Sequence, residues 1–373
     1  MFNFKQYDFK RYDISLLFII ILLGSIGAYL IRLVQLENEN LFEKQIIGLI
    51  LGITVAFIVS LVDYHFLGKL YILLYLINLI LLILVKYIGV SYNYAQRWLK
   101  VKYFEIQPSE LSKIILIIFL AKIFTEFREK INNGVFLLLT IIAMGIPLFL
   151  IMTQTDLSTS MVLMFVFAMM LFAAGLSWKI ILPVILIGVP LVTGVFWYVQ
   201  QDYQTLLSSS QQERVLSILN PEEYPDTMYQ QENSIKAIGS GLLSGKRFSD
   251  DESDIRGYDY VPINESDFIF AVAGEEFGFI GSCFILLLFA LIIYKALITA
   301  RRAPDRMGML IAVGLSAQLM FQVFVNVGVA TALLPNTGIP LPFLSSGLSS
   351  LMSSMIAAGI ILNIRLQVKN TRG

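Results

Sequence analysis

Ten long apolar runs dominate this sequence and decide what kind of fold it can adopt. A helix needs about 20 apolar residues to cross a bilayer core roughly 30 Å thick, so we expect each run to span a membrane. The runs are continuous and lack the strict alternation of barrel strands, which favours helices. The expected spans are residues 14–33, 45–62, 70–90, 109–125, 134–153, 158–175, 180–198, 267–297, 307–332 and 343–364. The sequence therefore predicts an all-α integral membrane protein, a ten-helix bundle forming a single domain over residues 1–373.

The composition agrees with a multi-pass membrane protein. Hydrophobic residues make up 57% of the chain and charged residues only 14%, which excludes an ordinary water-soluble globule. Basic and acidic residues balance at 27 each, and we expect no nucleic-acid partner. The single cysteine, Cys283, excludes disulfides within the chain. The single histidine, His65, is expected to be structural, because no metal-ligand spacing surrounds it.

Lys and Arg residues near the span ends predict the orientation of the bundle. With the N-terminus inside, the cytoplasmic side receives Lys5, Lys10, Arg11, Lys69, Arg128, Lys130, Lys179, Arg301, Arg302, Arg306, Arg365, Lys369 and Arg372. The opposite side receives the one long loop, residues 199–266, in which we expect short helices lying along the surface. Both termini are therefore expected in the cytoplasm, and the long loop outside it.

Three carboxylates stand at the start of the eighth expected span, in the stretch VPINESDFIFAVAGEEFGFIG (261–281). Asp267 lies where the loop enters the membrane. It could be a helix cap, or a carboxylate at the outer interface within reach of water and a lipid head group. Glu275 and Glu276 follow about 12–14 Å further along the helix. Acids at that depth usually face the bundle interior and pair with bases, so we expect these two to be structural.

Several bases are expected at the same side of the membrane as these acids. Lys44 begins the second span, Arg97 lies in the sequence QRWLK, and Lys113 lies just inside the fourth span. Such bases could form an anion site of the kind a phosphate needs. Lys113 and Glu110 are three residues apart on one helical face, so they could instead simply pair with each other.

Five motifs in order make the sequence resemble a known family. They are RW (97–98), QPSELSK (107–113), TQTDLSTS (153–160), the stretch 261–281 quoted above, and NVGVATALLPNTGIPLPFLSSGLSS (326–350). Together with the ten-span layout and the long loop before the eighth span, they resemble the shape, elongation, division and sporulation family over nearly the whole chain. Within that family the motifs are more similar to the elongation member than to the division member.

The resemblance implies a peptidoglycan glycosyltransferase that polymerises the lipid-linked disaccharide-pentapeptide lipid II on the outer face of a bacterial cytoplasmic membrane. Asp267 matches the family's essential aspartate, and it would act as the general base toward the acceptor hydroxyl. The pyrophosphate leaving group would need the cations Lys44, Arg97 and Lys113. Gln107, Glu110 and Asp156 would line the same cavity.

The resemblance also implies partners. A class B penicillin-binding protein would cross-link the new strands, and membrane lipids would surround the bundle. A divalent cation such as Mg2+ bridging pyrophosphate and carboxylate is compatible with this chemistry, although the sequence contains no dedicated metal-ligand cluster.

The chain departs from the family pattern at Thr155, Ser158, Ser346 and Leu348, and in the loop at Leu242 and Arg247. Two rival functions also stay open. A lipid II flippase would suit ten spans with interior charges, and a non-catalytic scaffold could recruit cell-wall synthesis proteins. Replacing Asp267 separates them from the enzyme, because neither needs a base at that position.

Overall fold

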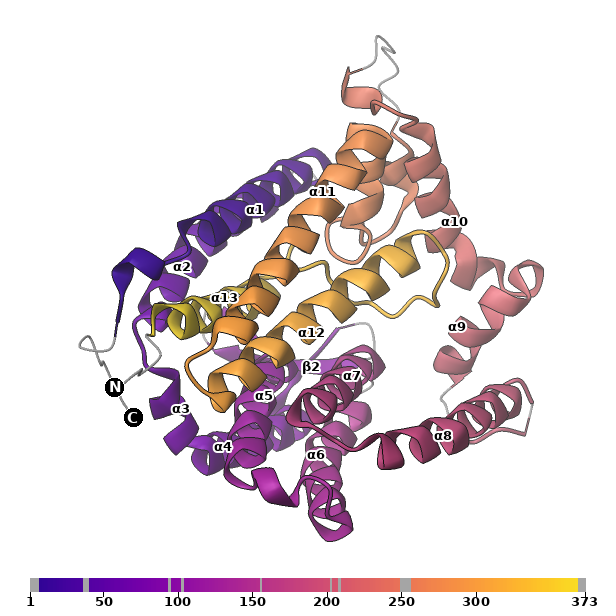
Figure 1. The fold of residues 1–373 in the computed structure, drawn as a ribbon. Helices are drawn as coiled ribbons and strands as arrows, with labels where there is room; N and C mark the ends of the chain where they lie inside the picture. Colours follow the sequence, from indigo (N-terminus) through magenta and orange to yellow (C-terminus); the bar gives the residue numbers. More distant parts are fainter. Residues whose placement is uncertain are drawn as a thin grey trace.

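The structure, a computed structural model, is a bundle of long helices, and it describes residues 7–35, 40–92, 95–101, 104–154, 156–201, 203–206, 209–248 and 256–367. The long helices in these ranges are α1 (Ile14–Val34), α2 (Leu41–Ser60), α4 (Tyr71–Ile88), α5 (Pro108–Glu126), α6 (Gly134–Thr153), α7 (Leu157–Ala174), α8 (Trp178–Val199), α11 (Ile269–Arg302), α12 (Arg306–Ala330) and α13 (Leu348–Leu366). They correspond one to one with the predicted runs, so the helical membrane fold is confirmed (Figure 1).

Within the described ranges, nine helices are long and apolar enough to cross a membrane. The remaining long helix is α5, the predicted fourth span, which contains two Lys and two Glu residues in its 19 positions. Its charged residues near the first turn, Glu110 and Lys113, are almost fully buried. The structure thus supports nine spans by length and composition, and the predicted count of ten is not confirmed.

The shorter elements lie between the long helices. They are α3 (Tyr64–Lys69), α9 (Ser209–Leu219), α10 (Pro225–Ser240) and the 3-10 turns η2 (Phe9–Arg11), η3 (Arg128–Lys130), η4 (Pro221–Glu223), η5 (Lys246–Phe248) and η6 (Gly257–Tyr260). The short helices predicted for the long loop are confirmed by α9 and α10. A small antiparallel sheet, β1 (Val90–Tyr92), β2 (Ala95–Val101) and β3 (Phe104–Ile106), was not predicted; its register pairs Val90 with Trp98 and Leu99 with Ile106.

The core of the bundle lies between α2, α5, α7, α11, α12 and α13. Helix α2 packs along α13, and α12 packs against α11, α7 and α5. Helix α8, with Pro183 and Pro190 inside it, stands apart from the other helices, and none of its apolar stretch is buried (Figure 1). Its contacts lie at its ends, where the Trp178 ring lies 5.9 Å from that of Phe172 on α7 and the Val199 carbonyl accepts from Gln212. A helix whose middle is apolar all round and exposed is stable only where lipid surrounds it.

Three predicted spans differ in detail from the helices observed. Helix α13 begins at Leu348, not at residue 343, because Phe343 and Gly347 take positive φ angles of 67° and 141° that interrupt a helix. Helix α11 is broken at Gly278, where φ is 65° and ψ is −166°. Helix α12 ends at Ala330, before Ala332 with φ 53°. Positions of this kind depend on tertiary contacts, so hydropathy does not reveal them.

The first and last residues that the structure describes, Tyr7 and Gln367, meet at one end of the bundle, which we call the terminal end. Tyr7 and Gln367 form an isolated antiparallel bridge there. The opposite end, which carries the long loop, we call the loop end. Both termini facing the cytoplasm stays a prediction.

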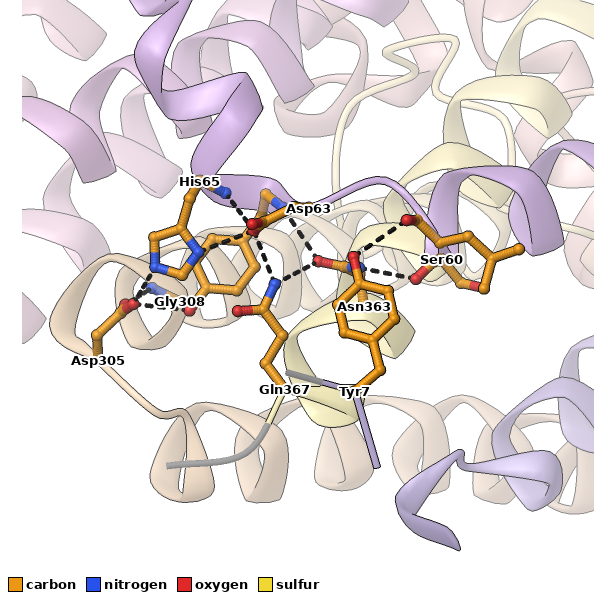
Figure 2. A network of polar contacts seen from close by, with 10 residues as sticks. Tyr7, Ser60, Asp63, His65, Asp305, Gly308, Asn363 and Gln367 are labelled. Carbon is orange, nitrogen blue, oxygen red and sulfur yellow. Dashed lines mark hydrogen bonds and ion pairs between the residues drawn. The ribbon is translucent and has the colours of Figure 1, made fainter. Parts of the chain in front are cut away.

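A polar network around His65 holds the terminal end together (Figure 2). The imidazole lies between two carboxylates, with Nδ1 2.8 Å from Asp63 Oδ1 and Nε2 2.5 Å from Asp305 Oδ2. Asp63 caps α3 and Asp305 caps α12, so one ring joins the starts of two helices. The hydrogen bond to Asp305 raises the pKa of His65, against the opposing effect of burial. The structural role predicted for His65 agrees with this arrangement.

The same network reaches the last span. The Asn363 side chain accepts from the Tyr64 backbone N–H and donates to the Ser60 carbonyl, and Gln367 Nε2 donates to Asp63 Oδ1 over 2.8 Å. The ends of α2 and α13 are therefore fastened to each other through side-chain amides (Figure 2).

Candidate active site

Asp267 lies in the turn that leads from the long loop into α11. The helix N-cap position is Phe268, not Asp267, and the Phe268 position has no side-chain cap hydrogen bond. Its carboxylate accepts a hydrogen bond from Ser266 Oγ at 3.1 Å. The residue is partly exposed. A carboxylate at this position can meet both water and a bound substrate.

A carboxamide on α12 fixes the backbone at Asp267. Asn326 Nδ2 donates to the Asp267 carbonyl at 2.8 Å and to the Ile339 carbonyl at 2.7 Å, and Asn326 is 1% exposed. Its Oδ1 is buried and has no partner among the described residues. Buried acceptors are normally satisfied by protein or ordered water, so this oxygen is suited to receive a donor from water or substrate.

The connection between α12 and α13, residues 331–347, packs directly against Asp267. Gly338 has φ 68°, and a Cβ placed on it would lie 3.2 Å from Asp267 Oδ2. Ser345 Oγ donates to the Ser266 carbonyl at 2.5 Å, and the Ser346 N–H donates to the Glu265 carbonyl at 2.8 Å. Glycine at 338 therefore serves two purposes, a left-handed backbone and open space beside the carboxylate.

A second polar centre forms around Asp156 at the start of α7. Its side chain, 2% exposed as a residue, accepts hydrogen bonds from Ser109 Oγ at 3.0 Å, Thr159 Oγ1 at 2.9 Å and Gln107 Nε2 at 3.3 Å. Arg97 Nη1 on β2 lies 3.9 Å from Asp156 Oδ1. The motifs around residues 97, 107 and 156, which are far apart in the sequence, thus meet at the loop end.

Asp267 and the polar centre around Asp156 lie on either side of one short segment, residues 337–338. Ser158 Oγ donates to the Thr337 carbonyl, and Thr337 is next to Gly338, which borders Asp267. Ser158 is one of the departures from the family pattern, and its hydroxyl is what makes this link. The departure at Thr155 lies outside the described residues. Asp267 and the Asp156 centre are therefore neighbours across residues 337–338.

Lys113 and Glu110 form the internal pair that the sequence left open as an alternative. Lys113 Nζ is 2.7 Å from Glu110 Oε1, and the two residues are 1% and 4% exposed. The Ser353 hydroxyl also donates to the Glu110 carbonyl at 3.1 Å. The Ser353 hydrogen bond joins α5 to α13, whereas the ion pair lies within α5. A cation neutralised in this way is less available to a phosphate than Arg97.

Lys44 is exposed in the first turn of α2. Its neighbour Gln45 is buried, with Nε2 3.4 Å from the Ser345 carbonyl. This contact places the first turn of α2 at the connection that borders Asp267. Lys44 is the predicted cation with the greatest freedom to reach an anion in water.

Glu275 and Glu276 pair with residues of the long loop. Glu275, 0% exposed, is paired with Lys246 and accepts the backbone N–H groups of Gly257 and Tyr258 at 2.7 and 2.8 Å. Glu276, 2% exposed, accepts Arg256 Nε at 2.9 Å and the Tyr258 hydroxyl at 3.0 Å. These acids fasten the loop to α11, which agrees with the structural role expected of them.

The described residues contain no group of three or more His, Cys, Asp or Glu side chains able to hold a metal ion. Sequence reasoning missed several residues of the site, namely Asn326, Thr337, Gly338, Ser345 and Ser109. One signal for Asn326 was present, because Gln318, Gln322 and Asn326 recur every four residues in an apolar helix, and all three are buried. Polar residues on one face of a membrane helix mark its interior side.

Comparison with known proteins finds matches over nearly the whole chain. Residues 11–370 match the FtsW, RodA and SpoVE family, described as cell cycle proteins. The stage V sporulation protein E of Bacillus subtilis is 34% identical over 94% of this chain and 96% of its own length. A protein named probable peptidoglycan glycosyltransferase FtsW, from Trichlorobacter lovleyi, is 31% identical over 98% of this chain and 96% of its own.

Two solved structures are similar in fold. A structure described as a peptidoglycan synthase complex coordinating polymerization and crosslinking superposes with a TM-score of 0.79 at 27% identity, over 95% of this chain and 97% of the other. The rod shape determining protein RodA of Thermus thermophilus superposes with a TM-score of 0.69 at 28% identity, over 95% and 96%. The chain belongs to the FtsW, RodA and SpoVE family of cell cycle proteins.

Proposed function

We propose that this protein is a peptidoglycan glycosyltransferase that polymerises lipid II, in the elongation branch of its family. The observation that carries the proposal is the position of Asp267, partly exposed at the mouth of α11 with Gly338 beside its Oδ2 and the Arg97–Asp156 centre across residues 337–338. A base and a cation on two sides of one segment match what a sugar transfer with a pyrophosphate leaving group needs. Relatives named peptidoglycan glycosyltransferases support the reaction class.

In the proposed reaction, Asp267 removes the proton from the acceptor 4-hydroxyl as that oxygen attacks the anomeric carbon of the growing chain. The bond from that carbon to the undecaprenyl pyrophosphate breaks, and the configuration inverts. Asn326 keeps the carboxylate in place by holding the Asp267 carbonyl from α12. Gly338 leaves room beside the carboxylate for the acceptor.

The pyrophosphate carries negative charge that cations must balance as it departs. Arg97 is the best placed of the predicted cations, because its guanidinium lies beside Asp156 and can form bidentate contacts to phosphate. Lys44 can reach the same region from α2. A divalent cation, if the reaction uses one, would be held by Asp267 together with the phosphates of the substrate, and it would balance their charge.

The proposal includes the cellular setting. The loop end faces the outside of a bacterial cytoplasmic membrane and both termini face the cytoplasm, because Lys and Arg concentrate at the terminal end. A class B penicillin-binding protein cross-links the strands produced. The likeness to a synthase complex that coordinates polymerization and crosslinking supports such a partner.

The test is polymerisation of fluorescent lipid II by the purified protein, with and without its cognate penicillin-binding protein, comparing wild type with Asp267→Asn. We expect glycan ladders from the wild type and none from the variant. Asp259→Asn is the matched control, because Asp259 is an exposed aspartate of the same loop, and it should polymerise normally. Equal ladders from wild type and Asp267→Asn would remove Asp267 as the base. If the wild type makes no ladders even with the partner, the flippase or the scaffold becomes the better hypothesis.

A further inference from the structure

The segment 241–248 of the long loop, which we call the loop tip, fills the break in α11. Because Gly278 is not helical, the N–H groups that follow it do not reach the carbonyls four residues earlier. The loop tip supplies acceptors for them instead. Phe279 N–H donates to the Leu242 carbonyl at 2.8 Å, and Ile280 N–H donates to the Leu243 carbonyl at 3.1 Å. The loop tip therefore acts as a backbone cap for the second half of α11.

Glycines allow the loop tip to approach α11 at backbone distance. A Cβ on Gly241 would overlap the Gly274 carbonyl oxygen, and a Cβ on Gly245 would overlap that of Glu276. A Cβ on Gly278 would in turn overlap the Gly245 nitrogen. Gly245 and Gly278 also have positive φ, 82° and 65°. The position of the loop tip along α11 is thus fixed closely by sterics.

The loop tip presents large apolar side chains outward. Leu242, Leu243 and Phe248 are 77%, 67% and 73% exposed. They continue the exposed apolar surface of α11, where Phe279 and Ile280 are 64% and 65% exposed. A soluble loop rarely exposes such a contiguous patch.

The length of α11 gives the depth of this patch. The part of α11 after Gly278, residues 279–302, is roughly 36 Å long at about 1.5 Å per residue, and it is by itself sufficient to cross a hydrocarbon core of about 30 Å. The break, and with it the loop tip, is then level with the membrane interface. The nine helix residues before the break, 269–277, need not lie within the core.

Helix α1 gives a second, independent measure of depth. The Arg247 guanidinium lies 5.8 Å from the centre of the Tyr29 ring, and Tyr29 stacks on Phe277. Tyr29 is five residues before the end of α1 at Val34, about 7–8 Å inside it. Tyrosine at this position is typical of the interface belt, and an arginine there reaches lipid head groups.

The cations of the loop tip do not oppose contact with lipid. Lys246 is neutralised by Glu275, which is fully buried. Arg247 lies over an aromatic ring and is exposed on its other side. The remaining outward side chains of the loop tip, apart from Ser244, are apolar.

We propose that the loop tip re-enters the membrane from the loop end, with Leu242, Leu243 and Phe248 in contact with the lipid acyl chains of that leaflet. It is a lipid-contact surface in the middle of a loop that hydropathy places in water. The proposal is independent of the reaction assigned to Asp267.

The experiment measures depth by spin labelling in nanodiscs of phosphatidylethanolamine and phosphatidylglycerol. The only native cysteine, Cys283, is exposed on α11, and it serves as the reference for a lipid-facing position. In a Cys283→Ser background, nitroxides are placed singly by Leu242→Cys and Phe248→Cys. Lys236→Cys on α10 is the control for a water-facing position, because that side chain is 71% exposed.

Relaxation of each nitroxide by molecular oxygen, which concentrates in lipid, is compared with relaxation by a water-soluble nickel chelate. We expect the labels at 242 and 248 to resemble the label at 283, with oxygen dominating, and the label at 236 to show the reverse. If the labels at 242 and 248 both respond to the nickel chelate as the label at 236 does, the loop tip is in water and the proposal is wrong. The same result would point to a protein partner as the occupant of the apolar patch. Two separate label positions keep the test decisive if one variant fails to fold.

Discussion

Removing the positive charge of Lys113 should destabilise the protein far more than removing an exposed lysine from the same helix. Lys113→Met leaves the Glu110 carboxylate buried without its partner at 2.7 Å. Breaking a buried ion pair by deleting one partner costs about 3–5 kcal/mol. We therefore expect a fall in Tm of roughly 5 °C or more.

Helix α5 supplies its own control. Lys122 and Glu126 pair at 3.2 Å, but their side chains are 31% and 45% exposed. An exposed pair contributes about 0–1 kcal/mol, so Lys122→Met should change Tm little. The double variant Glu110→Gln/Lys113→Met removes both charges and should recover most of the stability lost by Lys113→Met alone, since a neutral pair of similar volume is often as stable as the ionic one.

The assay is thermal unfolding of the detergent-purified variants, followed by intrinsic fluorescence. If the Tm of Lys113→Met is no lower than the Tm of Lys122→Met, the reasoning about the buried pair is refuted. A double variant as unstable as the single one would also refute it, because the loss would then come from packing. Lipid II polymerisation by the stable double variant then tests the role in pyrophosphate binding. Retained activity excludes Lys113 from that role, and lost activity assigns the Glu110–Lys113 pair to the substrate.

Two further predictions concern the terminal end and the Asp267 turn. The hydrogen bond to Asp305 raises the pKa of His65, so the stabilising effect of the charged ring is complete below its ordinary pKa of 6.5 and is lost as pH rises through the raised value. Tm of the wild type should therefore fall as pH rises above 6.5, and a His65→Gln variant with the same decline would contradict this. Asn326→Ala removes the donor to the Asp267 and Ile339 carbonyls, with an expected cost of about 1–3 kcal/mol in stability and a loss of polymerisation. Activity unchanged in Asn326→Ala, measured beside Asp267→Asn, would show that the turn keeps its geometry without the carboxamide.

The helices were predictable from the sequence because the membrane demands them. A lipid environment leaves a backbone few choices besides a helix, and runs such as 134–153 match α6 at both ends. The features that could not be predicted from the sequence are local ones. The sheet formed by β1, β2 and β3 lies in a stretch with no clear alternation, and its pairing depends on how the chain folds back on itself. The late start of α13 depends on turn contacts of Ser345 with Leu341 and Ser266.

The site was predictable residue by residue, but its assembly was not. Hydropathy and motifs single out Asp267, Arg97 and Asp156, yet nothing in their spacing says that they lie on two sides of residues 337–338. That relation depends on Ser158, whose hydroxyl holds the Thr337 carbonyl, and on Gly338, whose missing side chain leaves space beside Asp267. Small residues carry little signal in hydropathy, so the parts that bring the site together are the parts sequence reasoning overlooks.

The three acids at the start of α11 show how position decides what a carboxylate does. All three lie within a stretch of ten residues, and composition alone does not distinguish their roles. The long loop returns to α11 and supplies Lys246 to Glu275 and Arg256 to Glu276, so both glutamates are buried at 0% and 2% exposure. Burying a carboxylate with a cation and backbone donors satisfies it and keeps substrate away from it. Asp267 lies before the helix begins and stays partly exposed. It is therefore the acid of the three that an acceptor hydroxyl can reach.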